Sequence, residues 1–402
     1  MSFDIRPTRD RDEFRAALYA IGQYFSGQPS EERLDRFLGL LGLERMHAAF
    51  DGDVIVGGAG AFTFDFSVPG GSLPCAGVTV VGTYPTHRRR GVLTSVMRRQ
   101  LEDIHERGEP IAALWASEER IYGRFGYGLA SWWGAISVPR ASNGFTVPVD
   151  PRLQARFVER EAAAATFGPV WDVLRMQRTG TFARSEAWWN NRRLFVPDEE
   201  AGHPRRFVAL ERDGEVRAYA IYKPTFAFED GAPASKIDVL EAIGVDPEAT
   251  AAIWRFLFDI DWIASVDASL LPPDHPLFFL LAEPRRARFR MSDGLWVRLV
   301  DVGAALSGRA YLGDGSVVFD VRDTFCPWNE GRWKLDGGVA ARTDAPADIA
   351  LDVGSLGAAY LGAVSFTQLR DSLRLEELTS GAVARADAIF AWRPLPWCPE
   401  IF

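Results

Sequence analysis

The chain has 402 residues, enough for about two or three domains, and its 54 acidic against 45 basic side chains give a net charge of −9. This charge argues against general nucleic-acid binding, which needs Lys and Arg to neutralise phosphates. Three scattered cysteines, five unpaired histidines, and the lack of an apolar signal or spanning segment argue against disulfides, a metal site and a membrane partner, so we expect a soluble cytoplasmic protein.

Two segments near the N-terminus carry apolar residues at helical spacing, and we expect helices over residues 13–22 and 31–42. Ser30 stands immediately before the second segment, where a side-chain oxygen can cap a helix. Three residues later the sequence has Arg33, where a complete capping box has an acid or an amide. The second helix is therefore predicted to have only part of this motif.

A run of predicted strands follows, and a basic turn interrupts it. Asp51-Gly52 separates two apolar runs, which is a hairpin signal. Residues 62–66 alternate Phe with polar residues, as expected of a strand with one buried face, and another strand covers 76–83. From Gly91 apolar residues recur at helical spacing, and a short apolar strand covers 111–117. This order of elements indicates a mixed α/β domain.

The middle of the chain repeats this order. A second hairpin surrounds Asp213-Gly214, a strand covers 237–245 and an apolar helix covers 249–260, which indicates a duplicated module. The remaining residues read as strands with one small-residue helix, typical of an α+β domain. We therefore expect three domains, at residues 1–140, 141–290 and 291–402.

The turn within residues 81–94 is the feature that points to a function. Arg88, Arg89 and Arg90 stand at the start of the helix, where positive charge opposes the helix dipole and costs stability unless an anion binds. Gly91 allows close approach of the backbone to a ligand, and a helix N-terminus offers N–H groups to a phosphate. These features predict a pyrophosphate site; the alternative is a solvated basic turn.

The same residues carry a family resemblance. Arg88, Gly91 and Leu93 form R-x-x-G-x-L, which resembles the Q/R-x-x-G-x-G/A motif of the GNAT superfamily of N-acetyltransferases, with Leu93 replacing the final Gly or Ala. PTHRRRG at 85–91, followed by ASEERIYGRFGYG at 116–128, resembles the Eis (enhanced intracellular survival) family. The resemblance implies an α/β chain of two tandem acetyltransferase-like (GNAT) modules followed by a sterol-carrier-protein-like α+β domain. It also implies acetyl-CoA as cosubstrate and a homohexamer.

The resemblance assigns residues to the cofactor. The backbone of Val81, Gly82 and Thr83 is expected to pair with the pantetheine arm like an added strand. Ser117 and Glu118 are expected beside the cofactor. The residues expected around the pyrophosphate are Arg88, Arg89, Arg90, Gly91, Val92, Leu93 and Thr94.

The second module has a different turn at the corresponding place. Where the first module has the arginines, the second has Asp246, Pro247 and Glu248. Acidic side chains repel a phosphate. We therefore predict that the second module has lost cofactor binding and that the chain binds one acetyl-CoA.

Acetyl transfer needs a proton donor for the departing thiolate, and a tyrosine hydroxyl, with a pKa of about 10, can supply it. The resemblance implies that Tyr122 is this acid, with Tyr127 as a packing residue and the rival candidate; a core role for both is the alternative. It implies the terminal carboxylate of Phe402 as the base, held by burial of Trp397, Ile401 and Phe402. A docked terminus without a chemical role is the alternative.

The sequence says less about the amine that accepts the acetyl group than about the cofactor. The resemblance implies acetylation of small-molecule or peptide amines, such as aminoglycosides or lysine side chains, and a place for Trp296 in the substrate cavity. The acidic net charge is compatible with polyamines as well. The loop at 22–33 and the position of Glu400 differ from aminoglycoside-acetylating members. Alternatives are a non-catalytic protein that binds acyl-CoA or lipid, an aminoacyl-transferase-like enzyme acting on tRNA or peptidoglycan precursors, and a structural interaction protein.

Overall fold

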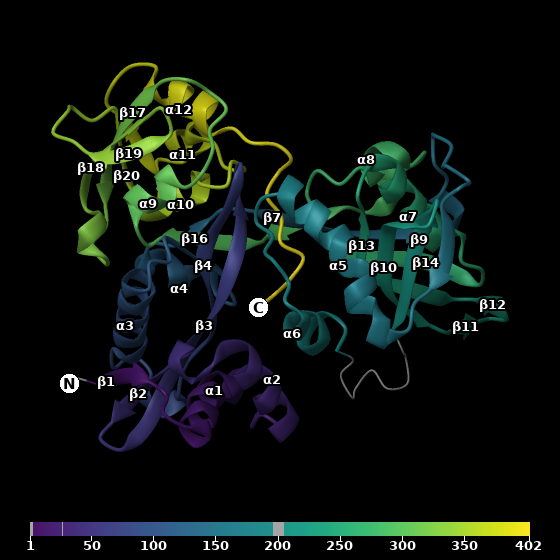
Figure 1. The fold of residues 1–402 in the computed structure, drawn as a ribbon, viewed down its shortest axis with the longest axis horizontal. Coiled ribbons are helices and arrows are strands. Elements are labelled where there is room, and N and C mark those ends of the chain that lie inside the picture. The colour runs from purple at the N-terminus through teal and green to yellow at the C-terminus, as the bar shows by residue number, and fades with distance from the viewer. Residues whose placement is uncertain (1–2, 26, 196–204) are drawn as a thin grey trace. The chain divides into compact units, whose positions relative to one another are not determined.

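The computed structural model describes residues 3–25, 27–195 and 205–402, and these residues form two compact units (Figure 1). Unit 1 combines the N-terminal part of the chain, up to Ser131, with Gly294–Pro396 and Ile401–Phe402. Unit 2 combines Trp132–Asp293 with Trp397–Glu400. The domain limits expected at residues 140 and 290 stay predictions.

The first sheet of unit 1 has the strand order β1-β2-β3-β4-β5-β16-β6. Its strands are β1 (Asp4–Pro7), β2 (Met46–Asp51), β3 (Val54–Val68), β4 (Gly71–Thr83), β5 (Ile111–Trp115), β6 (Gly128–Leu129) and β16 (Leu295–Leu299). The hairpin predicted at Asp51-Gly52 joins β2 to β3 and is confirmed. Strand β16 lies between β5 and β6, antiparallel to both, although it comes far later in the sequence.

Four helices of unit 1 accompany this sheet: α1 (Arg11–Phe25), α2 (Glu31–Leu41), α3 (Val92–Glu106) and α4 (Glu119–Tyr122). They confirm the predicted helical segments. Helix α3 buries Val96, Met97, Leu101 and Ile104, and this spacing of three and four residues places them on one face. The side chain of Ser30 accepts a hydrogen bond from the backbone N–H of Arg33, which confirms the predicted cap of α2.

The C-terminal sheet of unit 1 has the order β19-β18-β17-β20-β21. Its strands and helices are α9 (Val302–Ser307), β17 (Ser316–Arg322), β18 (Gly331–Asp336), β19 (Val339–Arg342), β20 (Ile349–Asp352), α10 (Val353–Ala359), α11 (Phe366–Asp371), β21 (Leu375–Glu377) and α12 (Ala382–Phe390). Helix α10 lies against β6 so closely that a Cβ at Gly128 would stand 1.8 Å from the carbonyl oxygen of Gly354. A glycine at position 128 is therefore needed for this contact.

Unit 2 contains a second mixed sheet, in the order β15-β7-β14-β13-β10-β9-β8, and a small β11-β12 hairpin. Its elements are β7 (Trp132–Pro139), β8 (Gln154–Phe157), α5 (Arg160–Gln177), α6 (Glu186–Trp188), β9 (Arg206–Arg212), β10 (Glu215–Thr225), β11 (Phe228–Glu229), β12 (Ala232–Pro233), β13 (Ser235–Gly244), α7 (Pro247–Asp259), β14 (Ile263–Leu271), α8 (Leu277–Leu280) and β15 (Arg290–Asp293). The second hairpin, strand and helix confirm the predicted repeat of the first module, and the mixed α/β class is confirmed.

Helix length and composition also bear on the expected relation to membranes. In the ranges that the structure describes, no helix is both long enough and apolar enough to cross a lipid bilayer.

Candidate active site

Strands β4 and β5 of unit 1 are paired over only part of their length. They run parallel, with Cys75 opposite Ile111 and Gly77 opposite Ala113. Beyond this point β5 continues its pairing with β16 as far as Trp115. Within the described residues, the second half of β4, at 78–83, therefore has no strand partner on this edge. Its backbone groups are available to an extended ligand.

A β-bulge accounts for this separation. The pairing of β3 with β4 shifts register between Gly58 and Gly60, opposite the stretch that contains Val80. Val80 has a φ of 47°, a left-handed conformation that a β-branched residue rarely adopts. A bulge bends the strand that carries it, so β4 turns away from β5 here. Backbone strain of this kind is typical of functional sites.

The gap opens into a cavity of about 540 Å³, which we call the donor cavity. It contains every residue that the sequence analysis assigned to the cofactor except Arg90. The residues that line it are Ile21, Tyr24, Val81, Gly82, Thr83, His87, Arg88, Arg89, Gly91, Val92, Leu93, Thr94, Ser117, Glu118, Ile121, Tyr122 and Arg124. Thr83 has a buried hydroxyl without a hydrogen-bond partner among the described residues, so this wall can accept one more polar contact.

The N-terminus of α3 borders the donor cavity and is open to an anion. Gly91 precedes the helix with a φ of 91°, and no side chain caps the first turn. The N–H groups of this turn have no partner inside the helix, and the helix dipole favours negative charge there. Arg88 and Arg89 line the cavity beside them, whereas Arg90 donates a hydrogen bond to Asp51 at 3.0 Å. The structure thus brings two of the three arginines to the cavity.

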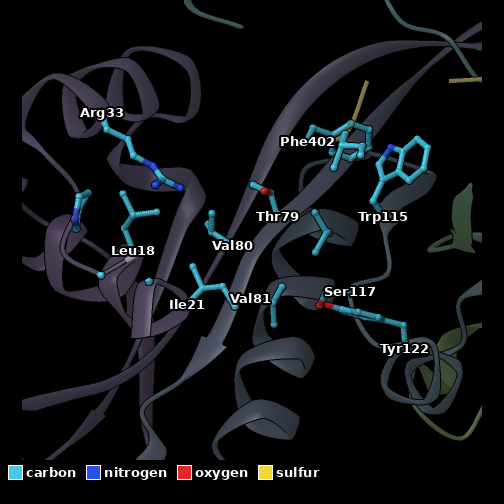
Figure 2. Close-up of a pocket in the computed structure, with 15 residues that line it drawn as sticks. Leu18, Ile21, Arg33, Thr79, Val80, Val81, Trp115, Ser117, Tyr122 and Phe402 are labelled. Carbon is cyan, nitrogen blue, oxygen red and sulfur yellow. The ribbon is translucent and has the colours of Figure 1, made fainter. Parts of the chain in front are cut away.

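A second cavity of about 310 Å³, the acceptor cavity, is lined by β4 residues 78–81 (Figure 2). Helices α1 and α2 supply one wall, with Leu18, Ile21 and Arg33, and Phe402 and Trp115 lie at the far end. The residues that line it are Leu18, Ile21, Gly22, Gly27, Pro29, Arg33, Val78, Thr79, Val80, Val81, Trp115, Ser117, Tyr122, Ile401 and Phe402. Ser26, in the same loop, lies outside the described residues.

The two cavities share four lining residues: Ile21, Val81, Ser117 and Tyr122. Tyr122 ends α4 and is 7% exposed. Burial, together with the negative charge of Glu118, raises the pKa of Tyr122 to about 12, so its hydroxyl is protonated at neutral pH. A proton donor therefore stands where the two cavities meet.

Tyr127 lies next to Tyr122 in a different environment. The two rings are edge to face, with centroids 6.0 Å apart. Tyr127 lines neither cavity, and burial raises its pKa strongly. Its hydroxyl has no hydrogen-bond partner among the described residues. The geometry therefore separates the two tyrosines, with only Tyr122 accessible to a substrate.

The C-terminal residues reach the acceptor cavity. Phe402 is 8% exposed, and its ring packs edge to face on Phe64 with centroids 5.0 Å apart. Trp397 is buried as expected. The expectation that Ile401 is buried is wrong, since it is 58% exposed. The physical reason is that Ile401 borders the open acceptor cavity.

Trp296, expected in the substrate cavity, lies on β16 opposite Leu114 and Leu129. It packs against the core cluster that contains Tyr122 and Tyr127, and it is absent from the lining of both cavities described above. The acceptor wall instead comes from α1 and α2, which sequence reasoning did not assign. The one available signal was Arg33, a cation where a capping box has an acid.

The corresponding helix start in unit 2 is closed. Asp246 caps α7 by accepting a hydrogen bond from the backbone N–H of Ala249 at 2.7 Å, and it pairs with Arg217. Strands β13 and β14 also separate, after Val239 pairs with Ala268. The cavity between them is only about 80 Å³, and Trp397 and Pro399 of the C-terminal segment help to line it. Unit 2 therefore has the strand gap without an open anion site.

A buried ion cluster in unit 2 holds Glu400. The fully buried guanidinium of Arg184 donates hydrogen bonds to Glu400 and, at 2.7 Å, to Glu241. Trp188 Nε1 donates to Glu400 at 2.7 Å. Burial alone would raise the pKa of Glu241, but the charges of Arg184 and Arg193 outweigh it and bring the pKa to about 2. Glu241 is therefore ionised at neutral pH, and the hydrogen bonds of Arg184 and Trp188 fix residue 400.

Known protein families match all three parts of the chain. Residues 4–130 and 180–299 each match an acetyltransferase (GNAT) domain, and residues 302–399 match a sterol carrier protein domain. These matches confirm the fold expected from the sequence, two GNAT modules followed by a sterol-carrier-protein-like domain.

Whole proteins and a solved structure agree with these matches. An uncharacterized N-acetyltransferase of Streptomyces avermitilis is 41% identical, with all of both chains covered. The N-acetyltransferase Eis of Mycobacterium tuberculosis is 34% identical over 85% of this chain and 84% of its own. The crystal structure of Eis1 from Mycobacterium abscessus superposes with a TM-score of 0.86 at 33% identity, covering 99% of this chain and 100% of its own. The chain therefore belongs to the Eis family of GNAT N-acetyltransferases.

Proposed function

We propose that this N-acetyltransferase moves an acetyl group from acetyl-CoA to the amine of a small molecule or peptide within unit 1. In this proposal Tyr122 is the general acid and the terminal carboxylate of Phe402 is the general base. The observation that carries the proposal is the position of Tyr122, which lines both the donor and the acceptor cavity. GNAT acetyltransferases use acetyl-CoA as cosubstrate, and the family membership of the chain extends this to it.

The donor cavity fits acetyl-CoA by the chemistry of its walls. The unpaired edge of β4 at Val81–Thr83 offers backbone groups to the amides of the pantetheine arm. The uncapped first turn of α3, with Arg88 and Arg89 beside it, offers N–H groups and positive charge to the pyrophosphate. Arg90 is assigned to the same site by family resemblance alone. When bound, acetyl-CoA supplies the acetyl group as a thioester.

The proton balance assigns the two catalytic residues. The attacking amine forms the new C–N bond and loses a proton, which the carboxylate of Phe402 accepts directly or through water. As the C–S bond breaks, the hydroxyl of Tyr122 donates a proton to the sulfur. Burial of Tyr122 supports this role, because a pKa raised to about 12 keeps the hydroxyl protonated whenever the amine is neutral. Phe402 supports its role by lining the acceptor cavity.

The proposal also covers which amine accepts the acetyl group and how the chain assembles. Aminoglycosides, polyamines and lysine side chains are the amines suggested by the family and by the net charge. We also propose, on family resemblance, that the chain assembles as a homohexamer.

We expect the purified protein, with an untagged C-terminus, to release thiol from acetyl-CoA only when an amine acceptor is added. The panel would contain aminoglycosides, polyamines, arylalkylamines and lysine peptides, and the released thiol would be followed colorimetrically. Acetyl-CoA binding without release on any amine would contradict acetyl transfer. It would favour the non-catalytic acyl-CoA-binding alternative.

We expect one acetyl-CoA to bind per chain. In unit 2 the carboxylate of Asp246 occupies the N-terminus of α7, which repels a pyrophosphate and removes the open N–H groups that α3 keeps. Titration calorimetry measures the stoichiometry directly. Replacing both Arg88 and Arg89 with Ala is expected to abolish the single site, and a second site that survives this change would contradict the assignment.

A further inference from the structure

The acceptor cavity contains one charged side chain among its described lining residues, and that side chain is a cation. Arg33 comes from α2, and Figure 2 shows its guanidinium pointing from the helix into the cavity. The wall between it and Tyr122 is formed by the apolar side chains of Leu18, Ile21 and Val80, and Thr79 adds one hydroxyl nearby. Tyr122 and Phe402 lie away from Arg33 in the same cavity.

Arg33 has no carboxylate partner in the described part of the chain, although acids are close in sequence. All three acidic residues of α2 pair with other arginines: Glu31 with Arg11 and Arg15, Glu32 with Arg36, and Asp35 with Arg11. The guanidinium of Arg33 lies 5.9 Å from the centroid of the Phe37 ring, at the outer limit of a cation–π contact. Its charge is thus available to a ligand.

The position of Arg33 in α2 is unfavourable for the helix itself. Ser30 caps α2 by accepting a hydrogen bond from the N–H of Arg33, and an acid or amide at this position would complete the capping box. A cation in the first turn also opposes the helix dipole. Local helix stability therefore does not explain an arginine here, whereas an anion in the cavity does.

We infer that the acceptor is a primary amine with an apolar body and a carboxylate at the end remote from the amine, as in an ω-amino acid. This inference rests on the proposed function, because the amine must lie between Tyr122 and the carboxylate of Phe402. The guanidinium of Arg33 then receives the remote carboxylate, with planar geometry suited to two parallel hydrogen bonds. A diamine or polycation of the same length would bring a positive end against Arg33, so the inference narrows the amines proposed above and disfavours polyamines and aminoglycosides.

The test is a series of acceptors that differ only in the remote group. Linear ω-aminoalkanoates, n-alkylamines and α,ω-diaminoalkanes, matched in chain length, carry a negative, neutral or positive group there. We expect the aminoalkanoate to have a kcat/KM about tenfold or more above that of the alkylamine, as for a charge-assisted contact, and the diamine to have the lowest value. An equal or reversed order would overturn the inference.

Arg33→Glu should reverse the order, with the diamine preferred and the aminoalkanoate rejected. This variant is expected to fold, because an acidic residue in the first turn of α2 is favoured by the helix dipole. Arg36→Glu, one turn away and paired with Glu32 outside the cavity, is the matched control and should keep the wild-type order. An unchanged order in Arg33→Glu, with turnover intact, overturns the inference and leaves acetyl transfer standing. Failure of every amine to release thiol counts instead against the proposed function.

Discussion

Replacing Tyr122 with Phe is expected to lower kcat for acetyl transfer by about 10²- to 10⁴-fold, the range typical of a lost general acid. The change removes one oxygen from a residue that is 7% exposed and lines both cavities, so the walls of the site should persist. The affinity for acetyl-CoA and the melting temperature should therefore stay near their wild-type values. Steady-state kinetics, calorimetry and thermal unfolding measure the three quantities.

Tyr127→Phe is the matched control for this prediction. Tyr127 contacts Tyr122 but lines neither cavity, and its buried hydroxyl has no partner among the described residues. Removing an unsatisfied buried hydroxyl is expected to be neutral or stabilising. Wild-type kcat in Tyr122→Phe together with a large loss in Tyr127→Phe would exchange the two roles. A loss in neither variant would mean that water protonates the thiolate.

The features that sequence reasoning found are those built from short segments. The turn at 85–91 joins a strand to a helix within a few residues, so its glycine, its arginines and the open helix N-terminus are visible without tertiary structure. The hairpins at Asp51-Gly52 and Asp213-Gly214 are equally local, and both were confirmed. The acidic residues of the turn at 246–248 are equally local, and they predict that this turn repels a phosphate.

The features that sequence reasoning missed depend on long-range packing. No local pattern shows that β16 inserts between β5 and β6, which decides where Trp296 lies. The gap beside β4 arises from a bulge at Val80 within an otherwise regular apolar run. Arg33 is the exception, because its conflict with the capping box was visible, although the cavity that it faces was not.

The C-terminal segment combines, within a few residues, features that its own sequence predicts and features that depend on distant parts of the chain. Its apolar character correctly indicated burial of Trp397 and Phe402, but Ile401 between them is exposed because it borders a cavity formed by α1, α2 and β4. Glu400 is an acid in an apolar tail, and its buried partner Arg184 is 216 residues away in sequence. An ion pair of this separation leaves no sequence pattern.

Converting the terminal carboxylate of Phe402 to an amide is expected to lower kcat by about 10²- to 10⁴-fold, because an amide cannot accept the proton of the attacking amine. The amide keeps the ring of Phe402 on Phe64, so acetyl-CoA affinity and stability should change little. The variant can be made by ligation of a synthetic C-terminal peptide. Ligation of the unmodified peptide gives the matched control, and wild-type turnover by the amide would contradict the role of the carboxylate.

A one-residue Gly extension after Phe402 separates the need for a carboxylate from the need for its position. The ring of Phe402 packs on Phe64 beside the acceptor cavity, which holds the last residue in place. An added glycine keeps a terminal carboxylate but moves it by about 3.5 Å, and displacements of about 1 Å already cost large factors in rate. We therefore expect the extended chain to be nearly as slow as the amide. Full activity in the extended chain and loss in the amide would mean that a terminal carboxylate suffices without a fixed position.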